Sequence, residues 1–212
     1  VFPPIADFVK EKLYEDQGLH CEVAKLKMDF MTRAQSLIHG DLHTGSIFIN
    51  EESTKVFDPE FCFYGPMGYD IGNVIANMIF AWANGDAAGA ADFCKWVEDV
   101  LVDVINMTKE KMEKYYDEHV TDTMCRNELY KKYYMDTIIE DTSAVAGLEL
   151  IRRIVGMANV KDITTIADEA KRARAEKICI TAAIDFIKNR SDKKCGKCFL
   201  KTLKDAIAEV DA

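Results

Sequence analysis

Three acidic side chains lie at the two ends of one short segment with β propensity. Asp41 occurs in a glycine-rich polar turn, and Asp58 and Glu60 follow the β-prone runs 46–50 and 54–57, which a polar link joins into a predicted hairpin. Pairing of the two strands would bring Asp41 close to Asp58 and Glu60. A lone carboxylate can orient a hydroxyl group and take its proton, and carboxylates two residues apart can bind Mg²⁺. Phosphoryl transfer requires both functions, the orientation and deprotonation of a hydroxyl group and the binding of Mg²⁺.

The rest of the chain is predicted to be helical. Apolar residues recur at helical spacing in residues 5–15 and 21–34, with Gly18 between the two helices, and the pattern resumes after Asp70. The sequence therefore predicts a mainly α (α+β) architecture in which one small hairpin carries the catalytic and metal-binding loops. Breaks in the later helical pattern are expected near Gly85, Asn106, Thr121, Gly156 and Asp192.

The acidic turn resembles the catalytic loop of a known group of enzymes. Its His-Gly-Asp triplet, which ends at Asp41, is similar to the motif of aminoglycoside, choline and related small-molecule kinases, which share the protein-kinase fold. The longer strings HGDLHTGSIFI and DPEFCFYGPMGYDIGNVIANM resemble the 5-methylthioribose kinases, in which a DxE motif replaces DFG. The resemblance extends over residues 22–190 and is densest in residues 37–82 and around Arg152 and Arg153.

The resemblance implies a role for each matching residue. Asp41 matches the catalytic aspartate, which would orient the acceptor hydroxyl and take its proton. Asp58 and Glu60 match the DxE pair that binds the metal and, through it, the nucleotide. Arg152 and Arg153 match twin arginines near the sugar substrate, where they would neutralise phosphoryl charge or position the sugar.

Further positions are expected to support the catalytic loop. Asp70 matches a buried aspartate that hydrogen-bonds the loop backbone, and it also lies where it could cap the following helix. His39 and His43 are expected to fix the loop, although His43 could instead contact the substrate. Ser46 replaces the asparagine that most relatives use as a metal ligand, so it is a weaker candidate ligand of metal and cofactor, and Glu60 could supply the lost oxygen.

The resemblance also implies an activity. The parent protein is expected to transfer the γ-phosphoryl group of ATP, with Mg²⁺, to the 1-hydroxyl of S-methyl-5-thioribose in methionine salvage, and to act as a homodimer. Two alternatives stay open: a kinase for another sugar, choline or an aminoglycoside, and a non-catalytic binding module with a kinase fold. The presence of Asp41, Asp58 and Glu60 speaks against a degenerate module.

Two motifs of the kinase fold are missing from the sequence. We find no glycine-rich phosphate loop, and no strand with a phosphate-pairing lysine precedes the acidic turn. Both motifs belong to the N-terminal lobe of that fold. We therefore expect residues 1–212 to form the C-terminal lobe alone, without the nucleotide-clamping lobe, and to phosphorylate poorly by themselves.

Composition and charge limit the partners. The formal net charge of −9 argues against binding of nucleic acid and against a polybasic membrane anchor. The sequence shows no signal-peptide pattern and no apolar run long enough to span a bilayer, so we expect a cytoplasmic protein.

The seven cysteines fall into two groups, five single residues and one CxxC pair. Five occur singly and are expected to be small buried side chains in a reducing compartment: Cys21, Cys62, Cys94, Cys125 and Cys179. Cys195 and Cys198 form a CxxC motif that follows a predicted helix and lacks a second pair. The simplest interpretation is an exposed turn between helices, and a dithiol or metal site is the alternative.

Overall fold

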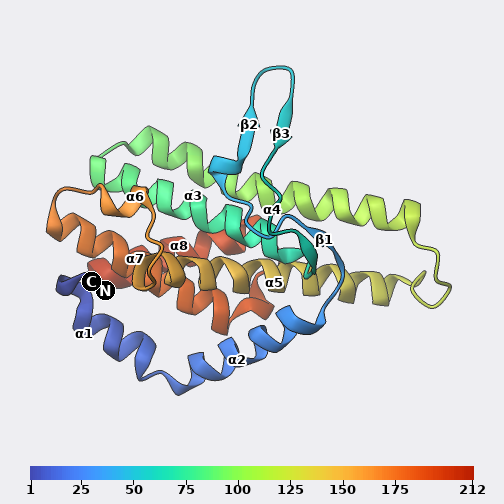
Figure 1. The fold of residues 1–212 in the computed structure, drawn as a ribbon, viewed down its shortest axis with the longest axis horizontal. Coiled ribbons are helices and arrows are strands. Elements are labelled where there is room, and N and C mark those ends of the chain that lie inside the picture. Colours follow the sequence, from blue (N-terminus) through green and yellow to red (C-terminus); the bar gives the residue numbers. More distant parts are fainter.

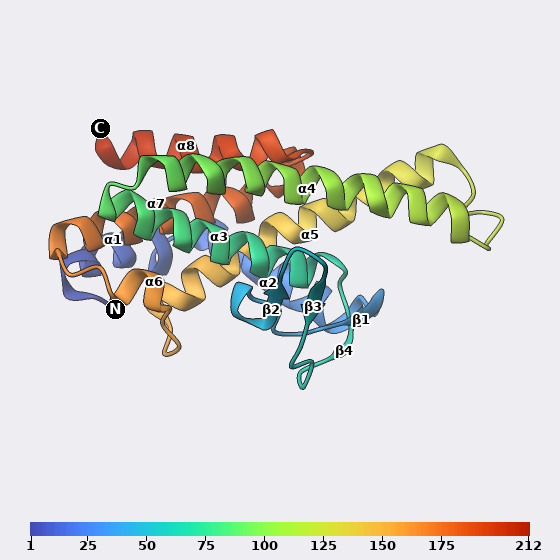
Figure 2. The same cartoon turned by 90° about the horizontal axis from the view of Figure 1, so that it is seen from above.

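The computed structural model describes all 212 residues and is built mainly of helices (Figure 1). The long helices lie roughly along the long axis of the molecule, and α2 lies along one side of them (Figures 1 and 2). The predicted mainly α architecture with a small hairpin is confirmed. The helices are α1 (Ala6–Val9), α2 (Gln17–Thr32), α3 (Gly68–Ala88), α4 (Ala91–His119), α5 (Glu128–Val155), α6 (Lys161–Thr164), α7 (Glu169–Lys188) and α8 (Gly196–Asp211).

One hydrophobic core joins these helices. Phe80 of α3, Leu101 of α4, Leu150 of α5, Phe186 of α7 and Phe199 of α8 are all fully buried members of it. Burial of such large side chains is the main favourable term in folding, at roughly 1.5–3 kcal/mol for each. The central helices α3 and α5 are therefore held rigidly, and both carry residues of the site described below.

The helix ends follow from local capping chemistry. The side chains of Asp16, Asn127 and Asp168 accept hydrogen bonds from the first backbone N–H groups of α2, α5 and α7. Gly89 ends α3 in the left-handed conformation, with φ of 74°. The cap at Asp16 also explains why α2 begins before the expected residue 21 and contains Gly18 within its first turn.

Two small antiparallel sheets interrupt the helices. The predicted hairpin consists of β2 (Ile47–Ile49) and β3 (Thr54–Val56), pairs Phe48 with Lys55, and projects from the helices (Figure 1). The second sheet pairs β1 (Ser36–Ile38) with β4 (Phe63–Gly65), which the sequence did not predict. Strands of three residues are too short to show an alternating pattern. The β1–β4 pairing draws the two ends of the acidic segment together.

One predicted helix break is displaced and one is wrong. Helix α3 continues through Gly85, where the missing side chain gives room to Phe93, and ends at Ala88. Helix α4 runs through Asn106, whose side-chain oxygen accepts a hydrogen bond from the Gly196 backbone. Each polar or small residue is thus used for a contact between helices. The expected breaks near residues 121, 156 and 192 agree with the ends of α4, α5 and the turn before α8.

The expectation for the single cysteines is only partly correct. Cys94 and Cys179 are buried, and Cys125 is half-buried. Cys21 and Cys62 are exposed, because they lie on the solvent side of α2 and in the loop before β4. None of the helices combines the length and the apolar character needed to cross a membrane.

Candidate active site

The turn that contains Asp41 is held by a carboxylate from α3. Asp70, in the first turn of α3, accepts hydrogen bonds from the backbone N–H groups of His39 at 2.6 Å and Gly40 at 3.0 Å. Helix α3 begins at Gly68, so Asp70 is not its N-cap and the predicted capping role is wrong. A buried backbone N–H group needs a partner, and one side chain satisfies two of them here.

The His39 side chain connects this turn to the segment that contains Asp58. Its Nε2 lies 2.9 Å from the carbonyl oxygen of Phe57, and its Nδ1 lies 3.3 Å from the backbone nitrogen of Asp41. A neutral imidazole has one donor and one acceptor nitrogen. Since the Asp41 N–H group donates to Nδ1, the tautomer in this arrangement carries its proton on Nε2 and donates it to Phe57.

A second contact joins the same two loops through their backbones. Gly40 adopts a φ of 85°, and a Cβ atom at this position would lie 2.2 Å from the carbonyl oxygen of Phe61. Only glycine fits such an approach without displacing the neighbouring chain. The turn before the hairpin and the loop after it are therefore in direct contact.

The proposed metal ligands occupy a different backbone geometry from the one expected. Asp58 has a left-handed φ of 68°, and Glu60 lies in a turn, so the segment is not extended and residue spacing does not place both carboxylates on one side. Both side chains are exposed and form no hydrogen bond or ion pair within the chain. A non-glycine residue in this conformation is uncommon and is often found at functional sites.

His43 and Ser46 contact each other beneath the loop. The Ser46 hydroxyl lies 3.2 Å from Nε2 of His43, and Ser46 is only 4% exposed. The Ser46 backbone carbonyl also accepts a hydrogen bond from the Phe57 N–H group at the base of the hairpin. The geometry thus gives both residues a part in fixing the loop.

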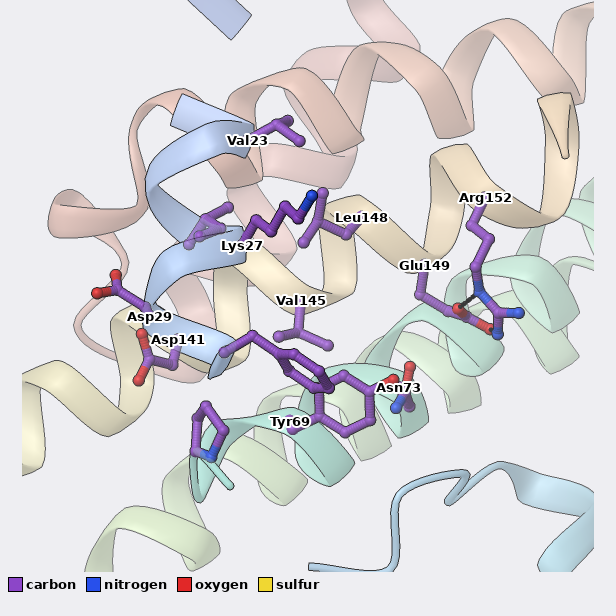
Figure 3. A pocket seen from close by; sticks show the side chains of 13 residues that line it. Val23, Lys27, Asp29, Tyr69, Asn73, Asp141, Val145, Leu148, Glu149 and Arg152 are labelled. Atoms are coloured by element: carbon purple, nitrogen blue, oxygen red, sulfur yellow. Dashed lines mark hydrogen bonds and ion pairs between the residues drawn. The ribbon is translucent and has the colours of Figure 1, made fainter. Parts of the chain in front are cut away.

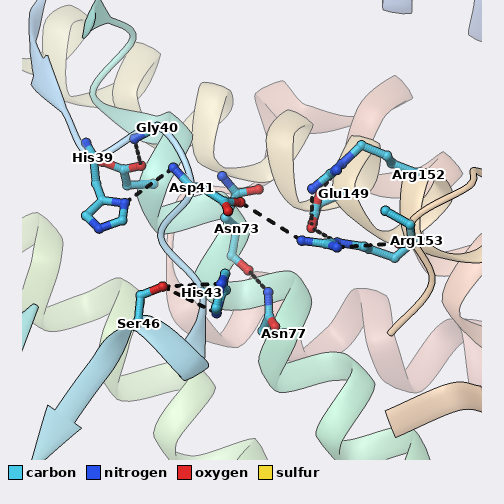
Figure 4. Close-up of polar contacts among 12 residues, drawn as sticks. His39, Gly40, Asp41, His43, Ser46, Asn73, Asn77, Glu149, Arg152 and Arg153 are labelled. Carbon is cyan, nitrogen blue, oxygen red and sulfur yellow. Dashed lines mark hydrogen bonds and ion pairs between the residues drawn. The ribbon is translucent and has the colours of Figure 1, made fainter. Parts of the chain in front are cut away.

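The arginine pair lies on the last turn of α5 beside Asp41. Arg153 is 4.0 Å from the Asp41 carboxylate, which is 41% exposed and points toward it (Figure 4). Glu149 accepts hydrogen bonds from Arg152 at 2.6 and 2.9 Å and from Arg153 at 2.7 Å. Burial opposes the charge of Arg152, but Glu149 stabilises it and the pKa of Arg152 is raised overall. Glu149 therefore stabilises the charge of Arg152 and orients both guanidinium groups, and Arg153 lies next to Asp41.

Sequence reasoning missed Glu149. This side chain is only 5% exposed, yet it lies three and four residues before the two arginines, the spacing at which side chains meet on a helix. An acidic residue at that spacing from two adjacent arginines was the sequence signal that could have identified Glu149 as their partner.

A pocket opens next to this cluster, between α2, α3 and α5 (Figure 3). Its volume is about 280 Å³. Val23, Leu26, Phe30, Val145 and Leu148 supply its apolar walls. Glu149 and Arg152 line one polar end of the same pocket, and Glu149 also pairs with Arg153, which lies beside Asp41. Further charged side chains line the pocket on the side of Asp141, so a small ligand with both apolar and polar groups would match it.

Two further interactions shape the pocket. Tyr69 lies against Phe30 with ring centroids 5.2 Å apart, and burial raises the pKa of the Tyr69 phenol, so the ring stays neutral near pH 7. At the opposite side, Nη1 of Arg33 donates to both carboxylate oxygens of Asp141, at 2.9 and 2.8 Å. This pair ties the chain after α2 to α5 beside the pocket.

The fit of Mg²⁺ to these residues depends on the donor atoms. No group of three or more His, Cys, Asp or Glu side chains converges on one point in the structure. Mg²⁺ commonly binds one or two protein carboxylates and takes its other ligands from phosphates and water. The free oxygens of Asp58 and Glu60 fit that limited role.

Comparison with known proteins finds similarity to phosphotransferases. The model of a family described as a phosphotransferase enzyme family matches residues 6–101. Methylthioribose kinase 1 of Oryza sativa subsp. japonica is 37% identical over 206 residues, which cover 88% of this chain and 47% of that protein. Methylthioribose kinases of Bacillus pumilus and Escherichia coli are 36% and 33% identical, covering 84% and 88% of this chain and 44% and 48% of their own lengths.

The chain spans about half the length of the curated relatives it matches. Its match to the family model includes the HGD turn, the DPE segment and Asp70, and the longer matches also reach the arginine pair on α5. The chain is thus similar to the phosphotransferase enzyme family over residues 6–101 and to the methylthioribose kinases over most of its own length.

Proposed function

We propose that the complete protein is a kinase that transfers the γ-phosphoryl group of ATP to the 1-hydroxyl of S-methyl-5-thioribose, a step of methionine salvage. One observation carries the proposal: Asp41 lies 4.0 Å from Arg153, and Glu149 links that pair to a half-enclosed pocket. A base, two fixed positive charges and a small-molecule cavity thus meet at one place.

The roles follow from the position of each side chain. Asp41 orients the acceptor hydroxyl and takes its proton, because its carboxylate is accessible beside the pocket. Arg152 and Arg153 orient the acceptor and offset the negative charge of the transferring group. The apolar walls of the pocket accept the methylthio group, and its polar end accepts the ribose hydroxyls.

The nucleotide side of the site is proposed to lie along the hairpin. Asp58 and Glu60 would hold Mg²⁺, which supplies positive charge to the nucleotide phosphates when bound. Phe48 and Phe57 stack with ring centroids 4.5 Å apart on an exposed surface of the hairpin. We infer that an N-terminal lobe covers this surface in the complete protein and completes the nucleotide site, and that residues 1–212 alone are poorly active.

A substrate panel tests the acceptor. The full-length protein is assayed with S-methyl-5-thioribose, ribose, choline and an aminoglycoside. Loss of the methylthio group should lower kcat/KM by about 10- to 200-fold, the range for a small apolar group in a pocket. Phe30→Ala should reduce the difference in kcat/KM between S-methyl-5-thioribose and ribose, because Phe30 forms an apolar wall of the pocket. The control Trp96→Ala, which removes an exposed aromatic side chain from α4, should leave that difference unchanged. A preference for choline or an aminoglycoside would refute the proposal.

The alternative of a non-catalytic binding module requires a separate test. Asp41→Asn in the full-length protein should abolish turnover and leave Mg²⁺-dependent ATP binding intact. Nucleotide binding by the wild type without any turnover of the panel would instead favour the binding module. Assembly as a homodimer stays a prediction of the family resemblance, and sedimentation of the full-length protein measures it.

A further inference from the structure

The start of α8 contains two thiols that the site above does not use. Cys195 immediately precedes α8, and Cys198 lies in its first turn. Their Sγ atoms are 3.1 Å apart, and both residues are half-buried free cysteines. The expectation of an exposed turn is therefore wrong, because packing against neighbouring helices covers part of the pair.

The surrounding contacts hold this turn in place. The Gly196 N–H group donates to the Asn106 side chain on α4 at 2.9 Å, and Lys194 donates to Glu140 on α5 at 2.7 Å. A side chain at Gly196 would lie 2.3 Å from the carbonyl oxygen of Val102, so the turn is seated tightly on α4. The sulfur atoms consequently meet through the fixed backbone and not through chance motion of a loose loop.

The local chemistry favours reaction between the two sulfurs. A disulfide bond is about 2.05 Å long, so the Sγ atoms need to approach by about 1 Å, a change within the range of side-chain rotation. Burial opposes ionisation of the Cys198 thiol, but hydrogen bonds from Cys195 and from the backbone at Lys194 outweigh it and lower the pKa of Cys198. The thiolate is the nucleophile in disulfide exchange.

We propose that Cys195 and Cys198 form a reversible dithiol–disulfide site that exchanges with low-molecular-weight disulfides. The Cys198 thiolate attacks one sulfur of the disulfide RSSR, whose S–S bond breaks, and RS⁻ leaves and takes up a proton. Cys195 then loses its proton and attacks the Cys198 sulfur of the mixed disulfide, and a second RSH leaves. Two cysteine thiols are oxidised and one RSSR is reduced to two RSH, and excess thiol reverses the reaction.

The structure favours this site over a metal site and over other thiols of the chain. A structural zinc ion needs four ligands, and no group of three His, Cys, Asp or Glu side chains converges near the pair. Cys94 and Cys179 are buried. Cys21 and Cys62 are exposed and far apart in sequence, which makes them internal controls for simple accessibility.

The test uses the intact chain in mixtures of reduced glutathione and glutathione disulfide. Samples are quenched with acid, alkylated and digested, and the mass of the peptide that contains both cysteines is measured by mass spectrometry. With excess glutathione disulfide we expect a peptide that is lighter by two hydrogen atoms and carries no alkyl group, and dithiothreitol should restore double alkylation. Cys21 and Cys62 should only gain glutathione.

Single variants separate the two steps. Cys195→Ser should retain glutathione on Cys198, since no second thiol resolves the mixed disulfide. Cys198→Ser should react at least about tenfold more slowly at neutral pH, because it removes the proposed attacking thiol. If a variant does not fold, the mass of the wild-type peptide alone tests the proposal. Double alkylation of the wild-type peptide, or two glutathione adducts on it, while Cys21 and Cys62 are modified would overturn the proposal.

Discussion

The imidazole of His39 lies 2.9 Å from the carbonyl oxygen of Phe57, the residue immediately before Asp58. This bond joins the turn that carries Asp41 to the segment that carries the two candidate metal ligands. The carboxylate of Asp70 on α3 holds the same turn by accepting two backbone hydrogen bonds. The relative placement of the acidic loops thus depends on a few hydrogen bonds and one close backbone contact, each of which a substitution can remove.

The close contact at Gly40 predicts unequal effects of two glycine substitutions. Gly89→Ala should cost about 1–2 kcal/mol of unfolding free energy, because alanine is strained at a positive φ and nothing lies within 4 Å of the new side chain. Gly40→Ala should cost more, since its Cβ would overlap the Phe61 carbonyl, and it should also impair kinase activity of the full-length protein. Urea unfolding and an ATP turnover assay measure both. Equal losses of stability with full activity would contradict the described contact.

The double role of Asp70 predicts a loss of stability from a very small change. Asp70→Asn leaves one side-chain oxygen for two backbone donors, so about 1–3 kcal/mol should be lost and the turn around Asp41 loosened. Asp92→Asn is the matched control, because Asp92 also lies in a first helical turn but is exposed and has no such partner. Thermal unfolding compares the two variants. A similar small loss in both would mean that Asp70 does not hold the turn.

The pairing of Glu149 with both arginines predicts a kinetic effect. Glu149→Gln should lower kcat of the full-length protein by about tenfold or more, because Arg152 and Arg153 lose the carboxylate that orients them next to Asp41. Glu140→Gln, on the same helix, removes a carboxylate that pairs with Lys194 and should leave kcat unchanged. Steady-state kinetics at varied ATP and acceptor concentration distinguish the effect on kcat from one on KM.

Asp185 predicts a pH dependence of stability. Burial opposes its ionisation, but hydrogen bonds from Asn189, Lys193 and Thr202 outweigh burial and lower the pKa of Asp185 below its ordinary value of 3.8. A carboxylate with a lowered folded-state pKa binds fewer protons when folded than when unfolded. Its contribution to stability is therefore present above that ordinary value and is lost as the pH falls through the folded-state pKa.

A pair of variants measures this contribution. Asp185→Asn should be less stable than the wild type by a constant amount between about pH 5 and pH 7, and the difference should shrink toward pH 2. Asp99→Asn removes an exposed carboxylate paired only with exposed Lys95 and should change stability little at any of these pH values. A wild-type advantage that grows on acidification would contradict the assignment.

Local sequence determined the helices, the hairpin and the order of the acidic residues. Helical periodicity, the polar link between two β-prone runs and the HGD and DPE strings involve residues close together in the chain, where propensity and spacing act directly. The predicted breaks near Gly85 and Asn106 were displaced and wrong, respectively, because both residues make contacts with a partner helix and do not end their own.

Only the tertiary structure decided how the acidic loops meet and what surrounds them. Four features join residues distant in the chain: the β1–β4 pairing, the bonds of Asp70 and His39, the pocket between α2, α3 and α5, and the packing of the Cys195–Cys198 turn against α4. Such contacts depend on which helix faces pack together, and short-range patterns do not specify that packing. The sequence thus predicted the candidate catalytic and metal-binding residues, and contacts with α3 and α5 decided where the turn of Asp41 lies.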